Sequence, residues 1–195
     1  GGWYDPDTSG HGALYQQNTI RDAMIAGMTL NIFNNHADRV RMANLAQMVN
    51  ALQSVILTKK EIMILTPTYH VMEMYKVHQD AALVPSEIES KDFYMGEKSV
   101  PALTVSASID KSDKLHISLT NIDNRNQQKI EIDLQGYAAK GVTGRILTSK
   151  DIRDLNTFDA PSKVKPATFD GTKLSDNKLK LEMPPNSVVV LELKR

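Results

Sequence analysis

The sequence predicts an α+β protein in which a mainly helical part, residues 1–80, precedes an antiparallel, jelly-roll-like β-sandwich, residues 81–195. Before about residue 80, apolar side chains recur every three or four positions, which is the period of an amphipathic helix. After that point they alternate, which is the period of a half-buried strand. Seven of the nine methionines also lie before residue 80, so the composition changes at the same place.

The first helix is predicted from about residue 13 to residue 35, around the stretch NTIRDAMIAGMTLNIFNNH. Its apolar and small residues, beginning with Ile20, fall at helical spacing. Thr19 and Asp22 are placed like the two polar partners of a capping box. The stretch therefore has both the periodicity and the start signal of a helix.

The second helix is predicted to begin at Pro67, because Thr66-Pro67 is a typical first-turn pair and good helix formers follow in TPTYHVMEMYKVHQ. Between the two helices, RMANLAQMVNAL is short and mostly apolar. It fits either a buried strand or a helix segment, and its periodicity alone does not decide between them.

The sandwich strands are predicted from period-two alternation and from the turn-rich segments between them. The closing stretch LKLEMPPNSVVVLELKR supplies two more strands around a Pro-Pro corner. Regularly spaced short strands favour an antiparallel sandwich. The alternating positions are Leu103, Val105, Ala107 and Ile109, then Leu115, Ile117 and Leu119, then Ile130, Ile132 and Leu134.

Composition excludes several classes of partner and chemistry. Lys plus Arg and Asp plus Glu number 23 each, so no broad electrostatic footprint for nucleic acid or an anionic membrane is present. The absence of cysteine removes disulfides, thiolate metal sites and cysteine nucleophiles. Apolar runs such as SVVVLEL are far shorter than the roughly 18 residues of a membrane span. We expect no cofactor, no nucleic-acid partner and no membrane span.

A metal site on the second helix is weighed and set aside. His70 and Glu73 would be neighbours on that helix, but His78 lies about 140° around from Glu73 at 100° per residue. Zinc-binding helices usually place two histidines four residues apart on one face. These side chains are therefore expected to be ordinary surface or capping groups, and no metal is assigned.

The charged stretch HADRVR could hold an anion, but pairing of Asp38 with Arg39 or Arg41 in a loop is the simpler interpretation. No glycine-rich phosphate loop precedes a helix, and no Gly-x-Ser-x-Gly motif occurs. Glycosidases need two carboxylates facing each other across a bond. The carboxylates here do not stand at credible strand ends and are expected to be solvated charges or caps: Asp5, Asp7, Glu61, Glu73 and Asp80.

Aromatic residues offer one candidate sugar-binding feature. Trp3, the only tryptophan, and Tyr4 could form a flat platform for a sugar face, although such pairs more often serve packing. The remaining aromatic residues are scattered and are expected to be core or loop anchors; among them are Phe93, Tyr94, Tyr137, Phe158 and Phe169.

Several stretches closely resemble the late catalytic region of glycoside hydrolase family 51 α-L-arabinofuranosidases. The most specific is HADRVRMANLAQMVN, preceded by LYQQNTIRDAMIAGMTLNIF. LTPTYHVMEMYKVHQ, SVPALTVSAS, HISLTNID, NTFDAPSKVKPATFDG and PPNSVVVLEL are also similar to that family, so the resemblance covers nearly the whole chain.

The resemblance implies a (β/α)₈ barrel followed by a C-terminal β-sandwich, with residues 1–80 as the incomplete last part of the barrel. Gly1 matches the glycine of a Glu-Trp-Gly-like motif, which implies a nucleophilic glutamate two residues before it. The acid/base glutamate would lie further upstream. No catalytic residue is therefore expected in this chain, and we expect the chain alone to be inactive.

Two residues are expected to contact substrate on the strength of the same resemblance. Trp3 matches a tryptophan beside the furanose-binding subsite, and Gln47 matches a glutamine that hydrogen-bonds the bound arabinose. An arabinose-containing polysaccharide or oligosaccharide is the implied partner, hydrolysed with retention, and homo-oligomerisation of the parent is left open. The alternative is a non-catalytic carbohydrate-binding or structural β-sandwich module.

Overall fold

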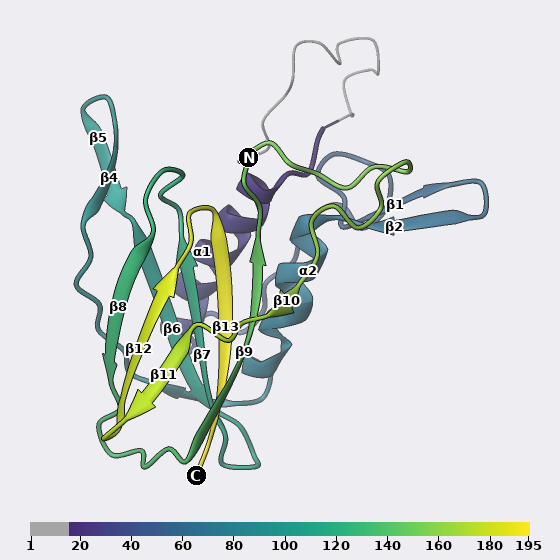
Figure 1. The fold of residues 1–195 in the computed structure, drawn as a ribbon. Helices are drawn as coiled ribbons and strands as arrows, with labels where there is room; N and C mark the ends of the chain where they lie inside the picture. Colours follow the sequence, from purple (N-terminus) through teal and green to yellow (C-terminus); the bar gives the residue numbers. More distant parts are fainter. Residues whose placement is uncertain (1–15) are drawn as a thin grey trace.

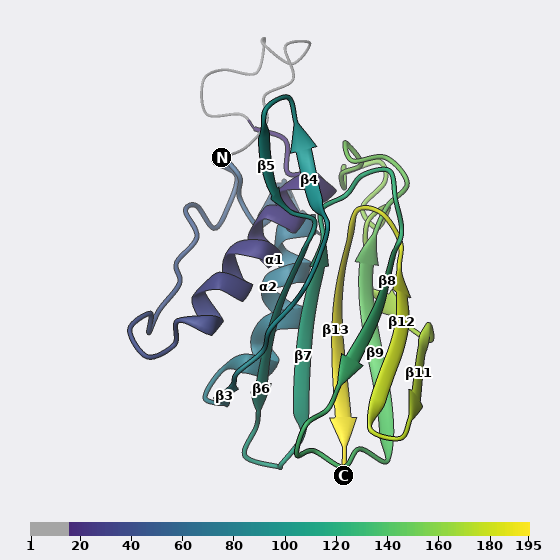
Figure 2. The same cartoon turned by 90° about the vertical axis from the view of Figure 1, so that its left-hand side faces the viewer.

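The computed structural model describes residues 16–195 and arranges them in three layers (Figures 1 and 2). Within these residues the helices are α1 (Ile20–Asn35) and α2 (Pro67–Met74), the latter continued by a 3₁₀ turn at Tyr75–His78. They cover one face of a large antiparallel sheet. A smaller sheet covers the other face.

The larger sheet has, in spatial order, β10 (Ala167–Thr168), β9 (Gly141–Thr148), β13 (Ser187–Lys194), β7 (Leu115–Asn121), β6 (Leu103–Ile109) and β3 (Ala82–Val84). The smaller sheet has β11 (Thr172–Ser175), β12 (Lys178–Met183) and β8 (Gln128–Asp133). The chain crosses between the sheets after β7, β8, β10 and β12, which makes a sandwich. Two further hairpins stand apart, β1 (Ile56–Lys59) with β2 (Ile62–Leu65) and β4 (Asp92–Met95) with β5 (Lys98–Pro101).

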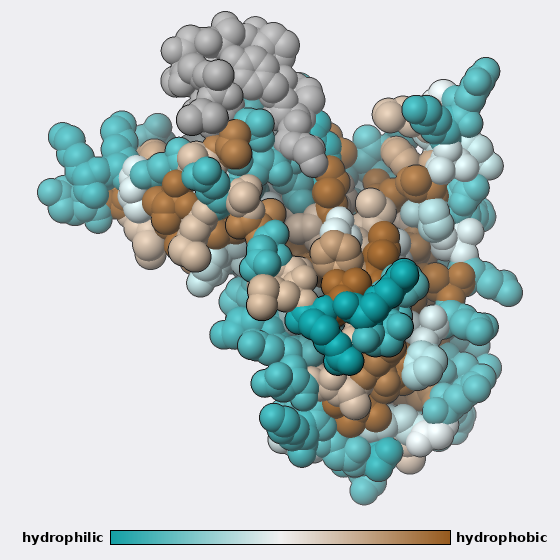
Figure 3. Space-filling model, turned by 180° about the vertical axis from the view of Figure 1, so that it is seen from behind, coloured by the Kyte–Doolittle hydropathy of each residue, from teal (hydrophilic) through white to brown (hydrophobic). Residues whose placement is uncertain are grey.

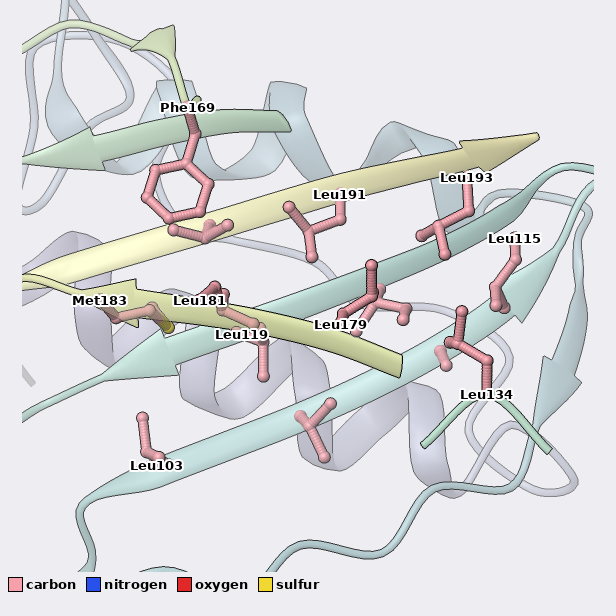
Figure 4. Packing of buried hydrophobic residues seen from close by; sticks show 14 of the residues in the cluster. Leu103, Leu115, Leu119, Leu134, Phe169, Leu179, Leu181, Met183, Leu191 and Leu193 are labelled. Atoms are coloured by element: carbon pink, nitrogen blue, oxygen red, sulfur yellow. The ribbon is translucent and has the colours of Figure 1, made fainter. Parts of the chain in front are cut away.

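The main apolar core lies between the two sheets (Figure 4). Leu119 from the larger sheet and Leu179 from the smaller one are almost fully buried in it. Burial of one such leucine stabilises the fold by about 1.5–3 kcal/mol. The predicted strands β6, β7 and β8 are confirmed, as are the two strands on either side of the Pro-Pro corner. β6 and β7, however, are buried on both faces instead of half-buried, because the helices cover the face that points away from the smaller sheet.

A second apolar core lies between the helices and the larger sheet, and β13 contributes to both cores. Val189 and Leu191 face the smaller sheet, whereas Val188 and Val190 face the helices. This burial on both faces explains why β13 is a continuous apolar run instead of an alternating one. Met24 of α1 is among the helical residues that complete the second core.

Each helix begins at its start signal in the sequence, the capping box at Thr19 for α1 and Pro67 for α2. The second starts at Pro67 as predicted, whereas the first starts at Ile20 instead of near residue 13. Residues 16–18 are not helical, and Thr19 forms an isolated bridge with Leu155 before the capping box turns the chain into α1. Neither helix in the described part of the chain is long and apolar enough to cross a membrane.

The expected barrel remnant is not found, which corrects the fold prediction. Residues 43–50, which the resemblance places on a barrel strand, form no strand and are exposed. A lone strand has no partner for its backbone groups, so it cannot remain a strand without neighbours. The chain is instead mostly β with two short helices, which share a core with the sandwich. The division into domains at residue 80 stays a prediction.

Candidate functional site

Buried polar side chains tie together the starts of the two helices. Asn18 Oδ1 accepts hydrogen bonds from the backbone nitrogen of Thr68 at 3.1 Å and from its Oγ1 at 2.9 Å. Asn18 Nδ2 donates to the carbonyl oxygen of Ser54 at 3.4 Å, and Thr66 Oγ1 donates to the same oxygen at 3.2 Å. Because buried polar groups cost free energy unless they are paired, these bonds hold three separate stretches of chain in one arrangement.

Asp22 holds the same end of the molecule together. Its Oδ2 accepts from the backbone nitrogen of Thr19 at 2.7 Å, as the predicted capping box requires. The same oxygen also accepts from Thr19 Oγ1 at 2.8 Å. Its Oδ1 accepts from Gln53 Nε2 at 2.6 Å. Gln53 follows the segment 41–50, so the bond fixes the place where that segment meets the helix starts.

Gln47, an expected sugar contact, lies on this segment. All ten residues of 41–50 are exposed, including Gln47 and the apolar side chains of Met42 and Met48, which are 75% and 67% exposed. Figure 3, the view from behind, shows apolar side chains gathered over this face of the molecule. Gln47 therefore presents its amide at the surface instead of bonding inside a core.

The other expected sugar contact, Trp3, lies outside the described residues, as do Tyr4, Asp5 and Asp7. The described residues begin at Gln16, two residues before Asn18 of the polar cluster at the helix starts. Of the two expected sugar contacts, the structure therefore places only Gln47, on the segment that meets the helix starts through Gln53.

Two of the three side chains weighed for a metal site, Glu73 and His78, bond to different partners. Glu73 receives two bonds from Arg145, at 3.1 Å to Oε1 and 2.8 Å to Oε2. His78 contacts Ser108 Oγ through Nδ1 at 2.7 Å and Ser118 Oγ through Nε2 at 2.6 Å. No cluster of three metal-ligating side chains occurs among residues 16–195.

The stretch around Asp38 is an exposed turn. Neither Arg39 nor Arg41 forms an ion pair with Asp38 in the part of the chain that the structure describes, so the predicted pairing is wrong. The physical reason is that all three side chains are solvated, where an ion pair gains little free energy.

A polar network between α1 and the larger sheet was not predicted. Tyr75 donates its hydroxyl toward Asn31 Oδ1 at 3.0 Å, and Ser106 Oγ donates to the same oxygen at 2.8 Å. Asn31 Nδ2 in turn donates to Thr104 Oγ1 at 3.0 Å. Burial raises the pKa of Tyr75 above its usual value. The network gives the helix one fixed position on the sheet, because a shift would leave these groups unpaired.

Histidines extend this polar layer toward the sheet edge. Burial, assisted by nearby His116, lowers the pKa of His78 to about 4, so His78 is neutral at pH 7. His116 Nε2 lies 3.0 Å from Asp110 Oδ2, and that bond is the main cause that lowers the pKa of Asp110 to about 2. The bonds of His78 to two serines and of His116 to Asp110 give both histidines a structural role.

Comparison with known proteins identifies the family. Residues 1–187 match the family model of the alpha-L-arabinofuranosidase C-terminal domain. An intracellular exo-alpha-L-arabinofuranosidase of Bacteroides ovatus is 44% identical over 195 residues, which cover 99% of this chain and 38% of that protein. This chain therefore spans well under half the length of the curated relative.

Solved structures agree. The GH51 arabinofuranosidase from Xanthomonas axonopodis pv. citri aligns with a TM-score of 0.90 at 40% identity, over 93% of this chain and 37% of that chain. The thermostable GH51 enzyme from Thermotoga petrophila RKU-1 aligns with a TM-score of 0.80 at 29% identity, over 93% and 40%. The resemblance found in the sequence is confirmed, and the chain belongs to the family of C-terminal domains of GH51 alpha-L-arabinofuranosidases.

Proposed function

We propose that this chain is the C-terminal part of a longer, exo-acting α-L-arabinofuranosidase. The whole enzyme would remove terminal non-reducing α-L-arabinofuranosyl residues from arabinan, arabinoxylan or arabino-oligosaccharides. Two matches carry the proposal: residues 1–187 match the C-terminal domain model, and the chain aligns with 38% of the length of a relative. That relative is an exo-arabinofuranosidase, which supports the exo mode.

The chemistry would be performed upstream of this chain. Retaining hydrolysis needs one carboxylate that attacks the anomeric carbon and a second that protonates the leaving oxygen and later activates water. Buried or paired carboxylates in the described residues have other partners: Asp22 caps α1, Glu73 pairs with Arg145 and Asp110 pairs with His116. We therefore expect the isolated chain to be inactive.

The exposed apolar surface on segment 41–50 and β2 would contact the catalytic part of the same polypeptide. Met42, Leu45 and Met48 are exposed on the segment, and Ile62 and Met63 are 54% and 61% exposed on β2. Exposed apolar side chains gathered in this way are typical of an interface. Most of the length of the relatives lies outside this chain. In the full-length protein that larger part, attached in the same polypeptide, would be the partner that covers this apolar surface.

Trp3 and Gln47 would contribute to sugar binding in the assembled enzyme. An amide hydrogen bond to a sugar hydroxyl is worth about 1 kcal/mol, so Gln47→Ala should lower kcat/KM of the full-length enzyme roughly three- to tenfold. The exposed Gln79, which follows the 3₁₀ turn, gives a matched control, since Gln79→Ala removes an amide of equal size elsewhere on the surface. Equal kcat/KM values for Gln47→Ala and Gln79→Ala would contradict a role for Gln47 in sugar binding.

The proposal is tested by analysing what the full-length enzyme releases from arabinan and arabinoxylan. We expect free arabinose as the first and main product. Release of longer oligosaccharides would contradict the exo mode, and no release from either polymer would contradict the proposed activity. If the 195-residue chain instead bound arabino-oligosaccharides in calorimetry while the full-length protein hydrolysed nothing, a binding module would be the better description.

A further inference from the structure

The β4–β5 hairpin extends beyond the body of the sandwich. In Figures 1 and 2 it projects from the same end of the molecule at which α1 and α2 begin. Within the described residues, its two strands form a sheet of their own. At the tip, Gly96 has φ +63, and an added Cβ there would meet nothing within 4 Å. The tip is therefore open to a ligand from outside.

The two faces of this hairpin differ in chemistry. Tyr94 pairs with Ser99 across the hairpin, and Asp92 lies two residues before Tyr94, so these three side chains share one face. Phe93 and Met95 belong to the opposite face. Ser99 Oγ donates to Asp92 Oδ2 at 3.1 Å, which holds the carboxylate on the same face as the tyrosine ring. Tyr94 is 67% exposed, which corrects its prediction as a core or loop anchor.

An exposed aromatic ring flanked by a carboxylate and a hydroxyl matches the surface of a sugar. The ring can pack against the apolar C–H face of a sugar while its hydroxyl stays hydrated. The carboxylate of Asp92 and the hydroxyl of Ser99 can exchange hydrogen bonds with sugar hydroxyls. An apolar protein partner would leave the Asp92 charge desolvated and unpaired, which is costly.

The position of the hairpin fits a polymeric substrate. The segment that holds Gln47 reaches the helix starts, where a hydrogen bond from Gln53 to Asp22 fixes its end. The hairpin projects from that end, away from the sandwich core. A polysaccharide extends past the one arabinofuranosyl unit that is removed, so a feature at the rim can contact its other units.

We propose that Asp92, Tyr94 and Ser99 form an accessory polysaccharide-binding subsite that favours polymeric over small substrates. This inference rests on the proposed function. It predicts that the hairpin adds to the binding of arabinan or arabinoxylan, whereas an aryl arabinofuranoside, which has no further sugar units, does not reach it.

The test compares Tyr94→Ala with Met95→Ala in the full-length enzyme. Met95 is 77% exposed on the opposite face of the same hairpin, so its loss controls for general changes in the hairpin. We expect Tyr94→Ala to lower kcat/KM on the polymer about three- to tenfold and to leave 4-nitrophenyl α-L-arabinofuranoside hydrolysis unchanged. Met95→Ala should change neither, and Tyr94→Phe should retain most polymer activity because it keeps the ring.

A binding readout separates this inference from the proposed function. Electrophoresis of the same proteins through gels that contain arabinan or arabinoxylan should show retardation of the wild type that Tyr94→Ala reduces, whether or not the enzyme is active. Unretarded wild type, or equal retardation and equal polymer kinetics for Tyr94→Ala, would overturn the subsite. A change of oligomeric state in Tyr94→Ala, measured by light scattering, would overturn it too, by assigning this face to a second copy.

Discussion

Gly27→Ala tests how closely α1 approaches the larger sheet. Gly27 lies on the buried face of α1, where an added Cβ would come within 2.6 Å of Thr120 Oγ1 and 3.3 Å of Val188 Cγ2. Reaching an ordinary 3.4 Å contact with Thr120 would need a shift of about 0.8 Å. Tyr75 donates a bond to the Gly27 carbonyl oxygen at 3.2 Å and lies 3.4 Å from Thr120 Oγ1, so the surrounding network resists such a shift.

Two physical effects oppose each other at this position. Helix propensity alone predicts that alanine in place of glycine stabilises the protein by about 1 kcal/mol. Overpacking a well-filled interface costs about 1–3 kcal/mol, and displaced hydrogen bonds add to that cost. We expect the packing effect to dominate, so that Gly27→Ala lowers the free energy of unfolding by about 1–2 kcal/mol.

Urea unfolding followed by circular dichroism measures this change. Thr120→Ala provides the matched background, because it removes the atom that the new Cβ would meet first. In that background the cost of Gly27→Ala should fall by about 1 kcal/mol or more, as expected for two residues in contact. An increase in stability of about 1 kcal/mol on Gly27→Ala in both backgrounds would refute the close packing of α1 on the sheet.

Two further predictions concern stability. In the folded protein the pKa of His78 is lowered from 6.5 to about 4, so protonation of His78 opposes folding. The free energy of unfolding should therefore be full above pH 6.5 and decline as the pH falls toward 4, by at most about 3 kcal/mol. Unfolding midpoints of wild type and His78→Gln across this range check it, and equal pH dependence would contradict it. Leu191→Ala, at a fully buried position between the sheets, should cost about 2–5 kcal/mol in urea unfolding. A cost below about 1 kcal/mol would place Leu191 outside a well-packed core.

The sandwich strands could be predicted because their local signals agree with their burial. β8 and β12 alternate both in sequence and in burial, so each has an inward and an outward face. The Pro-Pro corner ends β12 and separates it from β13 in the other sheet, since proline has no N–H to donate. The start of α2 follows in the same way from Pro67, whose fixed φ suits a first helical turn.

The segment 41–50 and the two projecting hairpins could not be predicted from local pattern. An apolar stretch such as RMANLAQMVNAL indicates burial without saying what buries it, and in this chain its first ten residues, 41–50, are exposed. The β4–β5 hairpin has mixed side chains on both strands, and its turn residue Gly96 is informative only once φ is known. Its outward Tyr94 could not be distinguished in sequence from a core aromatic.

The polar network of the second core left a weak signal in the sequence. Thr104, Ser106 and Ser108 alternate with the apolar residues of β6, and small hydroxyls in that pattern usually mark a face exposed to solvent. Here the helical layer covers that face: Asn31 of α1 bonds Thr104 and Ser106, and His78 bonds Ser108. The sugar contacts expected from the resemblance, Trp3 and Gln47, stay predictions, because one lies outside the described residues and the other awaits kinetic analysis.

Hydrolysis of 4-nitrophenyl α-L-arabinofuranoside, measured in parallel for the 195-residue chain and for the full-length enzyme, tests the central claim most directly. The chain should be inert, with its exact mass confirmed, and the full-length enzyme should release nitrophenol, because the proposed function places both catalytic glutamates upstream of this chain. Turnover by the purified chain itself, with contamination excluded, would show that carboxylates within these residues perform the chemistry and would contradict the account.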